Sequence, residues 1–223
     1  MNTITMTTAE DTKMVILQLS GTGTATIDWG DDKTKKIRLK EKGYSHTYSD
    51  ISTHTITITG DVTYLACEMS DLTSLDASNH MMLEHLEIYH NDLTTLNVSN
   101  SPRLEYLDCF ALQLTTLDVS KDPMLKHLDC SENLFTTLNV SNNPMLEHLN
   151  CCYNQLTSID VSNNPKLVNL YCIGNLLPTL DVSNNPMLVD LKCSDNQLKT
   201  LDVSKNPKLD YLEYDKKNVT LKR

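Results

Sequence analysis

The chain has 223 residues, of which 39% are hydrophobic, so it is long enough to bury a core as one domain or two. Its 29 acidic and 19 basic residues give a net charge of −10, which argues against nucleic acid or an anionic membrane surface as partner, because both require a basic patch. No apolar run approaches the ~20 residues that span a bilayer, so we expect no transmembrane segment.

The first 60 residues alternate hydrophobic and polar side chains in short stretches. This period of two is typical of half-buried strands. Glycine-containing turns separate the stretches, which are 4–6, 15–19, 25–29, 37–39 and 56–58. The pattern predicts a small antiparallel β-sandwich over residues 1–61.

Three segments of this part resemble a PKD-like domain. They are IDWGDD at 27–32, SHTYSD at 45–50 and TITITG at 55–60, where the family has WGDG, then HxY and a final TVTV strand. Asp32 stands where that pattern has Gly. Three carboxylates close to a glycine turn, at Asp28, Asp31 and Asp32, can also bind calcium, which we keep as an alternative to a role in the turn.

From Val62 to Arg223 the sequence repeats every 21 residues. LVNLYCIGNLLPTLDVSNNPM at 167–187 returns in register as LVDLKCSDNQLKTLDVSKNPK at 188–208. In LxxLxC the last Leu and the Cys lie two apart and face one side of a short strand, and the later LDV segment forms a second inward side. The fixed period predicts a β-solenoid over 62–223, with seven full coils, a partial eighth and a charged C-terminal edge. The strand at 55–59 should pair with the first coil and make the preceding domain its cap.

The phrase LxxLxCxxNxLTxLDVSxNPx resembles the 21-residue, cysteine-containing class of bacterial leucine-rich repeat, the internalin J-like class. The resemblance covers about three quarters of the chain. It implies a curved, right-handed leucine-rich repeat solenoid that binds proteins on its concave face, with no catalysis and no cofactor. It also implies an extracellular or cell-surface bacterial protein. The first residues show no signal peptide, so the protein is either intracellular or begins after a removed signal, and the resemblance favours the second.

Six of the seven cysteines, at 67, 109, 130, 151, 172 and 193, are separated by 21 or 42 residues. Such equivalent positions predict a ladder of thiols packed in the core, rather than disulfides or a metal cluster. Cys152 follows Cys151 directly and should point outward. We expect it to be the one thiol that reacts with an alkylating agent in the folded protein.

Two further positions concern the turns. The Asp or Asn two residues before Ser recurs in every coil and should be solvated or bonded to the turn. Leu112 stands where other coils have Asn, which predicts a local rearrangement if that Asn normally satisfies buried backbone groups. The Asp or Asn positions are Asp76, Asn97, Asp118, Asn139, Asp160, Asp181 and Asp202.

The residues that vary between coils on the LxxLxC strand are free to carry function. Aromatic side chains stand there beside acids, which is typical of a binding surface, although cross-strand aromatic pairs can also simply stabilise a sheet. The candidate ligand-binding residues are Tyr64, His85, Glu87, Tyr89, Tyr106, Asp108, Phe110, His127, Asp129, His148 and Tyr171.

His127 and His148 fall on adjacent strands with Asp129 nearby, so a zinc site or acid–base chemistry is an alternative. A flat, open sheet lacks the water-excluding pocket that either needs. We therefore expect no enzyme activity, no metal and no cofactor. The favoured interpretation is a monomeric recognition module for a protein or peptide; a glycan-binding adhesin or nutrient-capture protein and a structural spacer remain alternatives.

Overall fold

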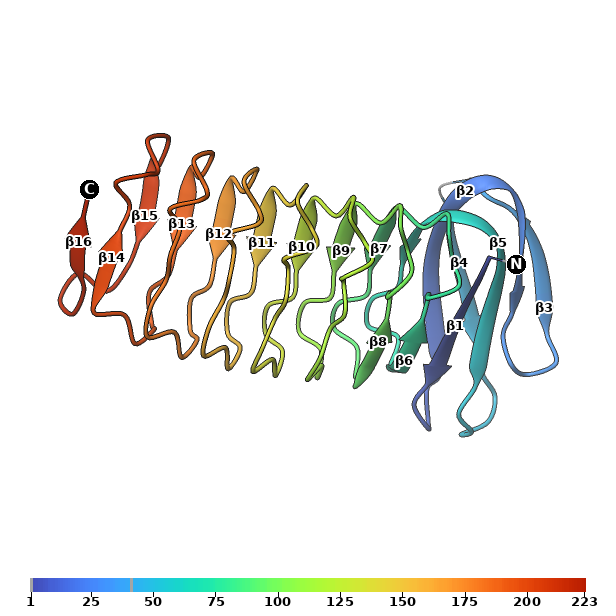
Figure 1. Ribbon diagram of the computed structural model, residues 1–223. Coiled ribbons are helices and arrows are strands. Elements are labelled where there is room, and N and C mark those ends of the chain that lie inside the picture. Colours follow the sequence, from blue (N-terminus) through green and yellow to red (C-terminus); the bar gives the residue numbers. More distant parts are fainter. Residues whose placement is uncertain (1, 41) are drawn as a thin grey trace.

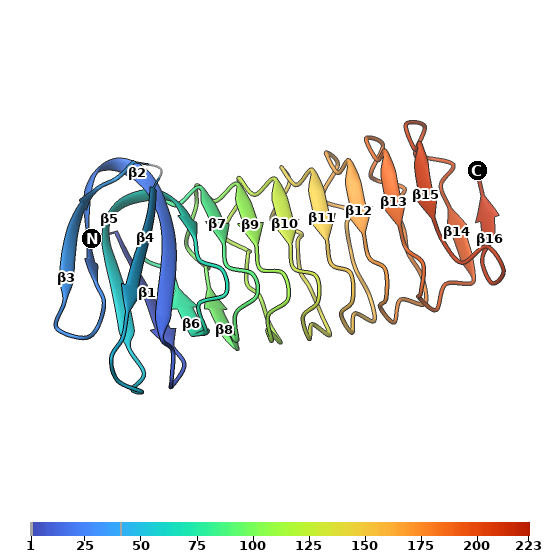
Figure 2. The same cartoon turned by 180° about the vertical axis from the view of Figure 1, so that it is seen from behind.

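The computed structural model of the protein describes residues 2–40 and 42–223. Within these residues it contains strands β1 to β16 and no helix, and hence no helix able to cross a membrane. The strands stack side by side into an elongated body, with β1 to β4 at one end and β14 to β16 at the other (Figure 1; seen from behind in Figure 2). The prediction of a mainly β solenoid with a 21-residue period is confirmed.

One side of the solenoid is a parallel sheet built from the LxxLxC segments. Each three-residue strand pairs in register with its equivalent in the next coil, as Leu86 does with Leu107 and Leu107 with Leu128. The sheet starts at the end of β5 (Thr55–Ala66), and its outward side is called the strand face below. The further strands are β7 (His85–Glu87), β9 (Tyr106–Asp108), β10 (His127–Asp129), β11 (His148–Asn150), β12 (Asn169–Tyr171), β13 (Asp190–Lys192) and β15 (Tyr211–Glu213).

The opposite side carries regular strands only near its two ends in the described part of the chain. These are β6 (Leu72–Asp76) with β8 (Thr95–Asn97), and β14 (Thr200–Asp202) with β16 (Thr220–Lys222). Elsewhere on this side Asp–Ser turns shape the chain. The carboxylate of Asp118, for example, accepts a hydrogen bond of 2.9 Å from the backbone nitrogen of Ser120. The same contact recurs in the other coils, which confirms the structural role expected for this position.

The N-terminal strands join both sides of the solenoid. They are β1 (Thr3–Thr8), β2 (Met14–Asp28), β3 (Thr34–Arg38) and β4 (Lys42–Thr47). β1 lies between β5 and β6 and is antiparallel to both. The long strand β2 pairs with β4 and with the end of β5 in its first half, and with β3 and the start of β5 in its second half. The expected border at residues 61 and 62 lies inside β5.

Two glycines allow β2 and β5 to approach each other closely. A Cβ atom on Gly21 would lie 2.2 Å from the carbonyl oxygen of Asp61, and one on Gly60 would lie 2.7 Å from the Cβ of Ala25. Any side chain at these positions would collide with the neighbouring strand. The two long strands can therefore bend across each other and serve both sides of the molecule.

The core between the two sides is a set of ladders of equivalent residues. Leucines at the two inward positions of LxxL are 0 to 1% exposed in the interior coils, and each contributes roughly 1.5–3 kcal/mol through burial. All seven cysteines are free thiols and all are buried. The predicted ladder of packed thiols is confirmed for the six equivalent cysteines.

Cys152 departs from expectation. It belongs to the row facing away from the core, yet it is only 7% exposed, and burial raises the pKa of its thiol to about 11. Its equivalents in the adjacent coils are Ser131 and Ile173. Side chains stacked at the ~4.8 Å spacing of neighbouring strands cover a group as small as a thiol, so the expected outward exposure is wrong.

The turn after the strand carries, in five of the seven full coils, an asparagine that bonds to two coils. The side-chain nitrogen of Asn133 donates to the carbonyls of Cys109 at 2.8 Å and Cys130 at 3.2 Å, and its oxygen accepts from the backbone nitrogen of Leu114 at 3.0 Å. Leu112 replaces this Asn and is 5% exposed. The turn nevertheless keeps its backbone geometry: φ is 53° at both Ala111 and Glu132, and the nitrogen of Ala111 donates to the carbonyl of Ser131 as that of Glu132 does to Cys152. The expected rearrangement is therefore not found in this turn.

Candidate functional site

A column of aromatic rings runs along the strand face. It consists of the residue just before the second leucine of LxxLxC in five successive coils, which are register partners: Tyr64, His85, Tyr106, His127 and His148. Ring centroids along the column are 4.8, 4.0, 4.2 and 5.6 Å apart. The planes of His85, Tyr106 and His127 are within 4° of parallel, so the strand register turns five distant residues into one stack. This group is the ring column.

A row of acids lies beside the ring column. The last residues of β7, β9 and β10 are Glu87, Asp108 and Asp129, which are direct register partners and form the acid row. Burial, together with the neighbouring carboxylates of Asp129 and Glu87, raises the pKa of Asp108 to about 6. In the described residues Asp108 forms no salt bridge, and its carboxylate accepts only from the backbone nitrogen of Phe110, at 3.0 Å. The row therefore holds acidic charge without a cationic side chain to balance Asp108.

The two ends of the acid row are held by other contacts. Nε2 of His85 lies 2.6 Å from the carboxylate of Glu87, which ties the row to the ring column. Asp129 accepts from the backbone nitrogen of Ser131 at 3.0 Å and from the side chain of Asn150 at 2.7 Å. These carboxylates are therefore fixed in place before any partner arrives.

Tyr89 and Phe110 form a third, shorter row on the same face. The ring of His90 lies edge-on to both, with centroids 5.7 Å from Tyr89 and 5.0 Å from Phe110. The adjacent carboxylate of Glu68 raises the pKa of Tyr89 to about 12. His90 is exposed and has a left-handed φ of 54°, and no motif or spacing in the sequence distinguishes it.

Tyr171 stands apart from the other candidates, two coils beyond the acid row. Its hydroxyl donates to Asp190 at 2.8 Å, and the Nζ of Lys192 lies 4.4 Å from its ring centroid. The structure thus separates the predicted site into a large acidic and aromatic part over β5 to β11 and a single tyrosine with its own charged neighbours.

The two histidines of the metal alternative belong to the ring column. Their centroids are 5.6 Å apart, and the other face of His127 stacks on Tyr106. Burial lowers the pKa of His127, and so does the nearby His148. No cluster of three metal-ligating side chains exists anywhere in residues 2–40 and 42–223.

A shallow hollow lies along the ring column. It measures about 380 Å³ and is bordered on its outer side by Glu84, Glu105 and Lys126. Nζ of Lys126 lies 2.6 Å from the carboxylate of Glu105 in the preceding coil. The hollow is an open trough that suits an extended chain better than an enclosed small molecule.

The sequence-based prediction missed the continuation of the strand face into the N-terminal strands. A second hollow, of about 240 Å³, lies between β2 and the first coils and is lined by Ile16 and Gln18 as well as by Met69, Glu68 and Glu87. The alternation at 15–19 indicated which residues of β2 face the core. It could not indicate that the outward ones adjoin the repeats, because that depends on the distant pairing of β2 with β5.

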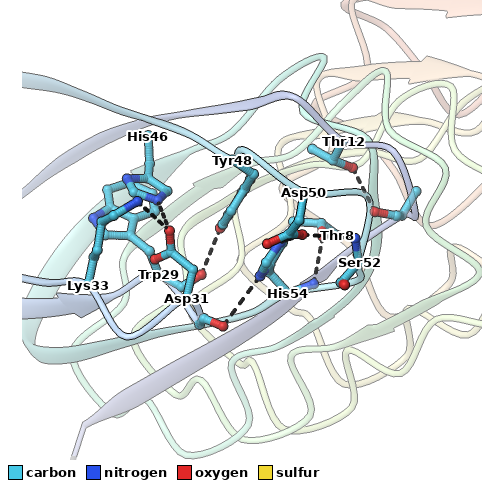
Figure 3. A network of polar contacts seen from close by, with 12 residues as sticks. Thr8, Thr12, Trp29, Asp31, Lys33, His46, Tyr48, Asp50, Ser52 and His54 are labelled. Atoms are coloured by element: carbon cyan, nitrogen blue, oxygen red, sulfur yellow. Dashed lines mark hydrogen bonds and ion pairs between the residues drawn. The ribbon is translucent and has the colours of Figure 1, made fainter.

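Two of the three acids of the calcium alternative, Asp28 and Asp31, are engaged in contacts of their own, and Figure 3 shows those of Asp31. Asp31 Oδ2 lies 2.8 Å from both Nζ of Lys33 and Nε2 of His46. Burial alone would raise the pKa of Asp31, but the hydrogen bonds from these two partners lower it to about 2. Asp28 accepts from the backbone nitrogen of Gly30 at 3.0 Å, so Asp28 and Asp31 are used within the turn and its neighbours.

The rest of this network packs the turn onto the following strands. The ring of Trp29 stacks on His46 at 4.8 Å, and that of Tyr48 stacks on His54 at 3.8 Å. The hydroxyl of Tyr48 donates to the carbonyl of Trp29 at 2.8 Å (Figure 3). The HxY segment and the WGDD turn, far apart in sequence, thus form one structural unit.

No family model and no curated protein matches the chain. Among solved structures it is similar to a leucine-rich repeat protein of Leptospira interrogans, with 22% identity and a TM-score of 0.58 over 61% of this chain and 38% of that one. It is also similar to an internalin of Listeria monocytogenes, with 24% identity and a TM-score of 0.55 over 62% of this chain and 42% of that one.

A Listeria monocytogenes internalin domain described as including a cysteine ladder matches at 23% identity over 75% of this chain and 57% of that one, with a TM-score of only 0.38. The chain spans about two fifths of the length of the first two solved chains. At these identities the likeness shows a leucine-rich repeat fold.

Proposed function

We propose that the protein is a non-enzymatic recognition module that binds a protein or peptide through the strand face, as a monomer, at the surface of a bacterial cell or outside it. The single observation that carries this proposal is the ring column lying beside the acid row on one preorganised sheet. Backbone pairing, buried asparagines and buried leucines fix the positions of these side chains in advance. A partner therefore loses little free energy to ordering the site.

The charge of the site favours a partner with a basic surface. Burial, and after it the neighbouring carboxylates of Asp129 and Glu87, raises the pKa of Asp108, which means that the ionised row is held at an electrostatic cost. A lysine or arginine from a partner would relieve this repulsion, and it would do so where water is already partly excluded. Complementary charge also speeds association and selects among partners.

The ring geometry favours a protein over a glycan. A sugar stacks on a free aromatic face, but the faces of His85, Tyr106 and His127 are covered by one another. What they present outward is ring edges and polar atoms. The same stacking also stabilises the sheet, so the rings serve both roles.

The N-terminal segment fits the proposal as a PKD-like cap preceding a repeat domain that starts at residue 62. Its support is β1, which pairs with β6 along the outer edge of the first coil. An uncovered coil would leave strand edges and core side chains exposed to solvent and to other chains.

The test is a selection of binding peptides from a randomised phage-displayed library, followed by titration of the selected peptides. We expect the combined change of Tyr89, Tyr106 and Phe110 to alanine to weaken binding by at least tenfold, which corresponds to about 1.4 kcal/mol. Tyr153→Ala is the matched control, because Tyr153 is 55% exposed and lies outside the three rows.

Equal affinity of the triple variant and the unchanged protein would refute the proposal. A glycan array run in parallel distinguishes the alternative: binding of a glycan that depends on the same three rings, with no peptide selected, would identify an adhesin. If generic polar residues at these positions altered nothing in either assay, the face would be a structural spacer.

A further inference from the structure

The strand face does not end at the first coil. The first half of β2 lies antiparallel to the end of β5, with Gln18 opposite Ala66 and Ser20 opposite Tyr64. Register partners share a face and alternate residues point the same way, so Ile16 and Gln18 stand on the same side as Tyr64. The strand face therefore passes from the repeats onto the N-terminal strands.

At this junction the surface holds two large apolar side chains that solvent reaches. Ile16 is 43% exposed and Met69 is 71% exposed, and both line the hollow of about 240 Å³. Met69 has a left-handed φ of 47°, as residues at the equivalent position of the later coils do, and its side chain extends into solvent. Exposed apolar side chains that cluster around a hollow indicate a contact site, whereas isolated exposed apolar side chains are normal on a protein surface.

The strand beside this hollow leaves it open. Gly43 and Ser45 of β4 are the register partners of Gln18 and Ile16. A Cβ atom added to Gly43 would meet nothing within 4 Å. No bulky side chain of β4 therefore covers the apolar pair from that direction.

The charge of the hollow is wholly acidic. Its lining includes the carboxylates of Glu68 and Glu87 and, among the residues described, no lysine or arginine. Glu87 is also the first member of the acid row, so acidic charge continues from the hollow toward Asp108. If an apolar side chain of a partner entered this hollow, the neighbouring residues of that partner would lie next to the carboxylates of Glu68 and Glu87.

We propose that the junction hollow is an anchor site for a peptide segment in which an apolar side chain is followed closely by lysine or arginine. The apolar side chain packs against Ile16 and Met69, and the cationic one lies between Glu68 and Glu87. This inference rests on the proposed function and specifies where on the strand face a partner is anchored and with what chemistry. A segment held in this way would continue along the ring column over β7 and β9.

The test uses the peptides selected on phage against the unchanged protein. We expect them to share an apolar residue near a basic one, and Ile16→Ser and Met69→Ser each to weaken their binding by about tenfold. Leu176→Ser is the matched control for Ile16→Ser, because Leu176 is 44% exposed and lies far along the solenoid. Urea unfolding of each variant verifies that the change has left the fold intact.

A second set of variants tests the role of the two carboxylates. Glu68→Gln with Glu87→Gln should bind the selected peptides several-fold more weakly, and should bind peptides with Gln in place of the basic residue as well as the unchanged protein does. Peptides that lose affinity with the triple ring variant but not with the Ile16 or Met69 variants would overturn the anchor and leave the proposed function standing. Selection of no peptide at all would overturn both.

Discussion

The side-chain nitrogen of Asn143 donates a hydrogen bond of 2.9 Å to the backbone carbonyl of Asp122, the residue 21 positions earlier that holds the same place in the preceding coil. Asn164, Asn185 and Asn206 continue this buried corner ladder in the same way. Asp122 is its one carboxylic acid and is 0% exposed. Its Oδ1 accepts from the backbone nitrogen of Ser101 at 3.1 Å, and its Oδ2 has no partner among the described residues.

We predict that Asp122→Asn stabilises the protein at neutral and alkaline pH. Burial raises the pKa of Asp122 from 3.8 to about 7 in the folded state. Between pH 4 and pH 7 the folded protein still holds the proton of Asp122, whereas the unfolded chain has lost it. The stability that the protonated carboxyl contributes is therefore fully present below pH 4 and is lost as the pH rises through 7. The asparagine cannot ionise, so we expect a gain of about 2 kcal/mol in the free energy of unfolding at pH 8 and little gain at pH 4. Urea titrations at both values measure it.

Asp118→Asn is the control from the same coil. Hydrogen bonds from Ser120 lower the pKa of Asp118, so its stabilising effect has the opposite sign: it is present above pH 4 and is lost on acidification. This variant should keep the decline in stability between pH 4 and 7. If Asp122→Asn also kept that decline, the buried carboxyl would not be its source.

The turn asparagine that follows the strand, described above for Asn133, should be among the positions of the repeats where substitution destabilises the protein most. The side-chain nitrogen of Asn154 donates to the carbonyl of Cys130 at 3.0 Å, and its oxygen accepts from the backbone nitrogen of Phe135 at 3.0 Å. Alanine there leaves buried backbone groups unpaired and creates a cavity, so we expect a loss of roughly 3 kcal/mol in the free energy of unfolding.

Asn154→Leu tests which of these two effects dominates. Leu112 occupies the equivalent place in another coil without disturbing the backbone, so leucine should fill the cavity and cost about half as much as alanine. Equal losses for the two variants would show that the hydrogen bonds alone account for the effect.

The repeat period alone was enough to place the core and the rows of the strand face. A fixed spacing of 21 residues brings equivalent positions into register, which is why the burial of Leu149 and Cys151 and the adjacency of His127 and His148 followed directly. The period could not foresee that His85 and Tyr106 lie parallel at 4.0 Å, because ring orientation depends on side-chain rotamers.

Other features depended on contacts that no repeat encodes. The junction hollow requires β2 to pair with the end of β5, a long-range antiparallel contact made possible by the bends at Gly21 and Gly60. The burial of Cys152 depended on its neighbours in the stack. The sequence correctly predicted that the Cys152 side chain points away from the core, but it could not predict how much of that side chain the adjacent coils bury.

A left-handed residue follows the strand face in every coil, and we predict that glycine is favoured there. Glu132 has a φ of 53° and is exposed, and the equivalent residue in a later coil is Gly174 at 66°. Side chains other than glycine cost roughly 1 kcal/mol in this conformation. Glu132→Gly should therefore raise the free energy of unfolding by about 0.5 kcal/mol, since part of the relief is offset by the greater freedom of glycine in the unfolded chain.

Gln155→Gly provides the comparison. Gln155 is also exposed but has no left-handed φ, so glycine brings only the entropic loss and should lower the free energy of unfolding by about 0.5 kcal/mol. Changes of the same sign in both variants would contradict the role of the left-handed position.

The seven cysteines should not react with thiol reagents while the protein is folded. Burial raises the pKa of Cys152 to about 11, and burial also raises the pKa of Cys67 and Cys193, each to about 12. At pH 8 even Cys152 is ionised in only about one molecule in a thousand, and the thiolate is the form that reacts. We expect no rapid reaction of the native protein with a thiol-specific disulfide reagent, and reaction of all seven cysteines in concentrated urea.

Ser162→Cys calibrates the rate, because position 162 is exposed in an Asp–Ser turn and a thiol there should react within minutes. A single equivalent released at that rate from the unchanged protein would show that Cys152 reaches solvent. If Cys152→Ala then abolished the release, the stack around Ser131 and Ile173 would open in solution. In that case the strand face would be less rigid than a preorganised binding surface requires.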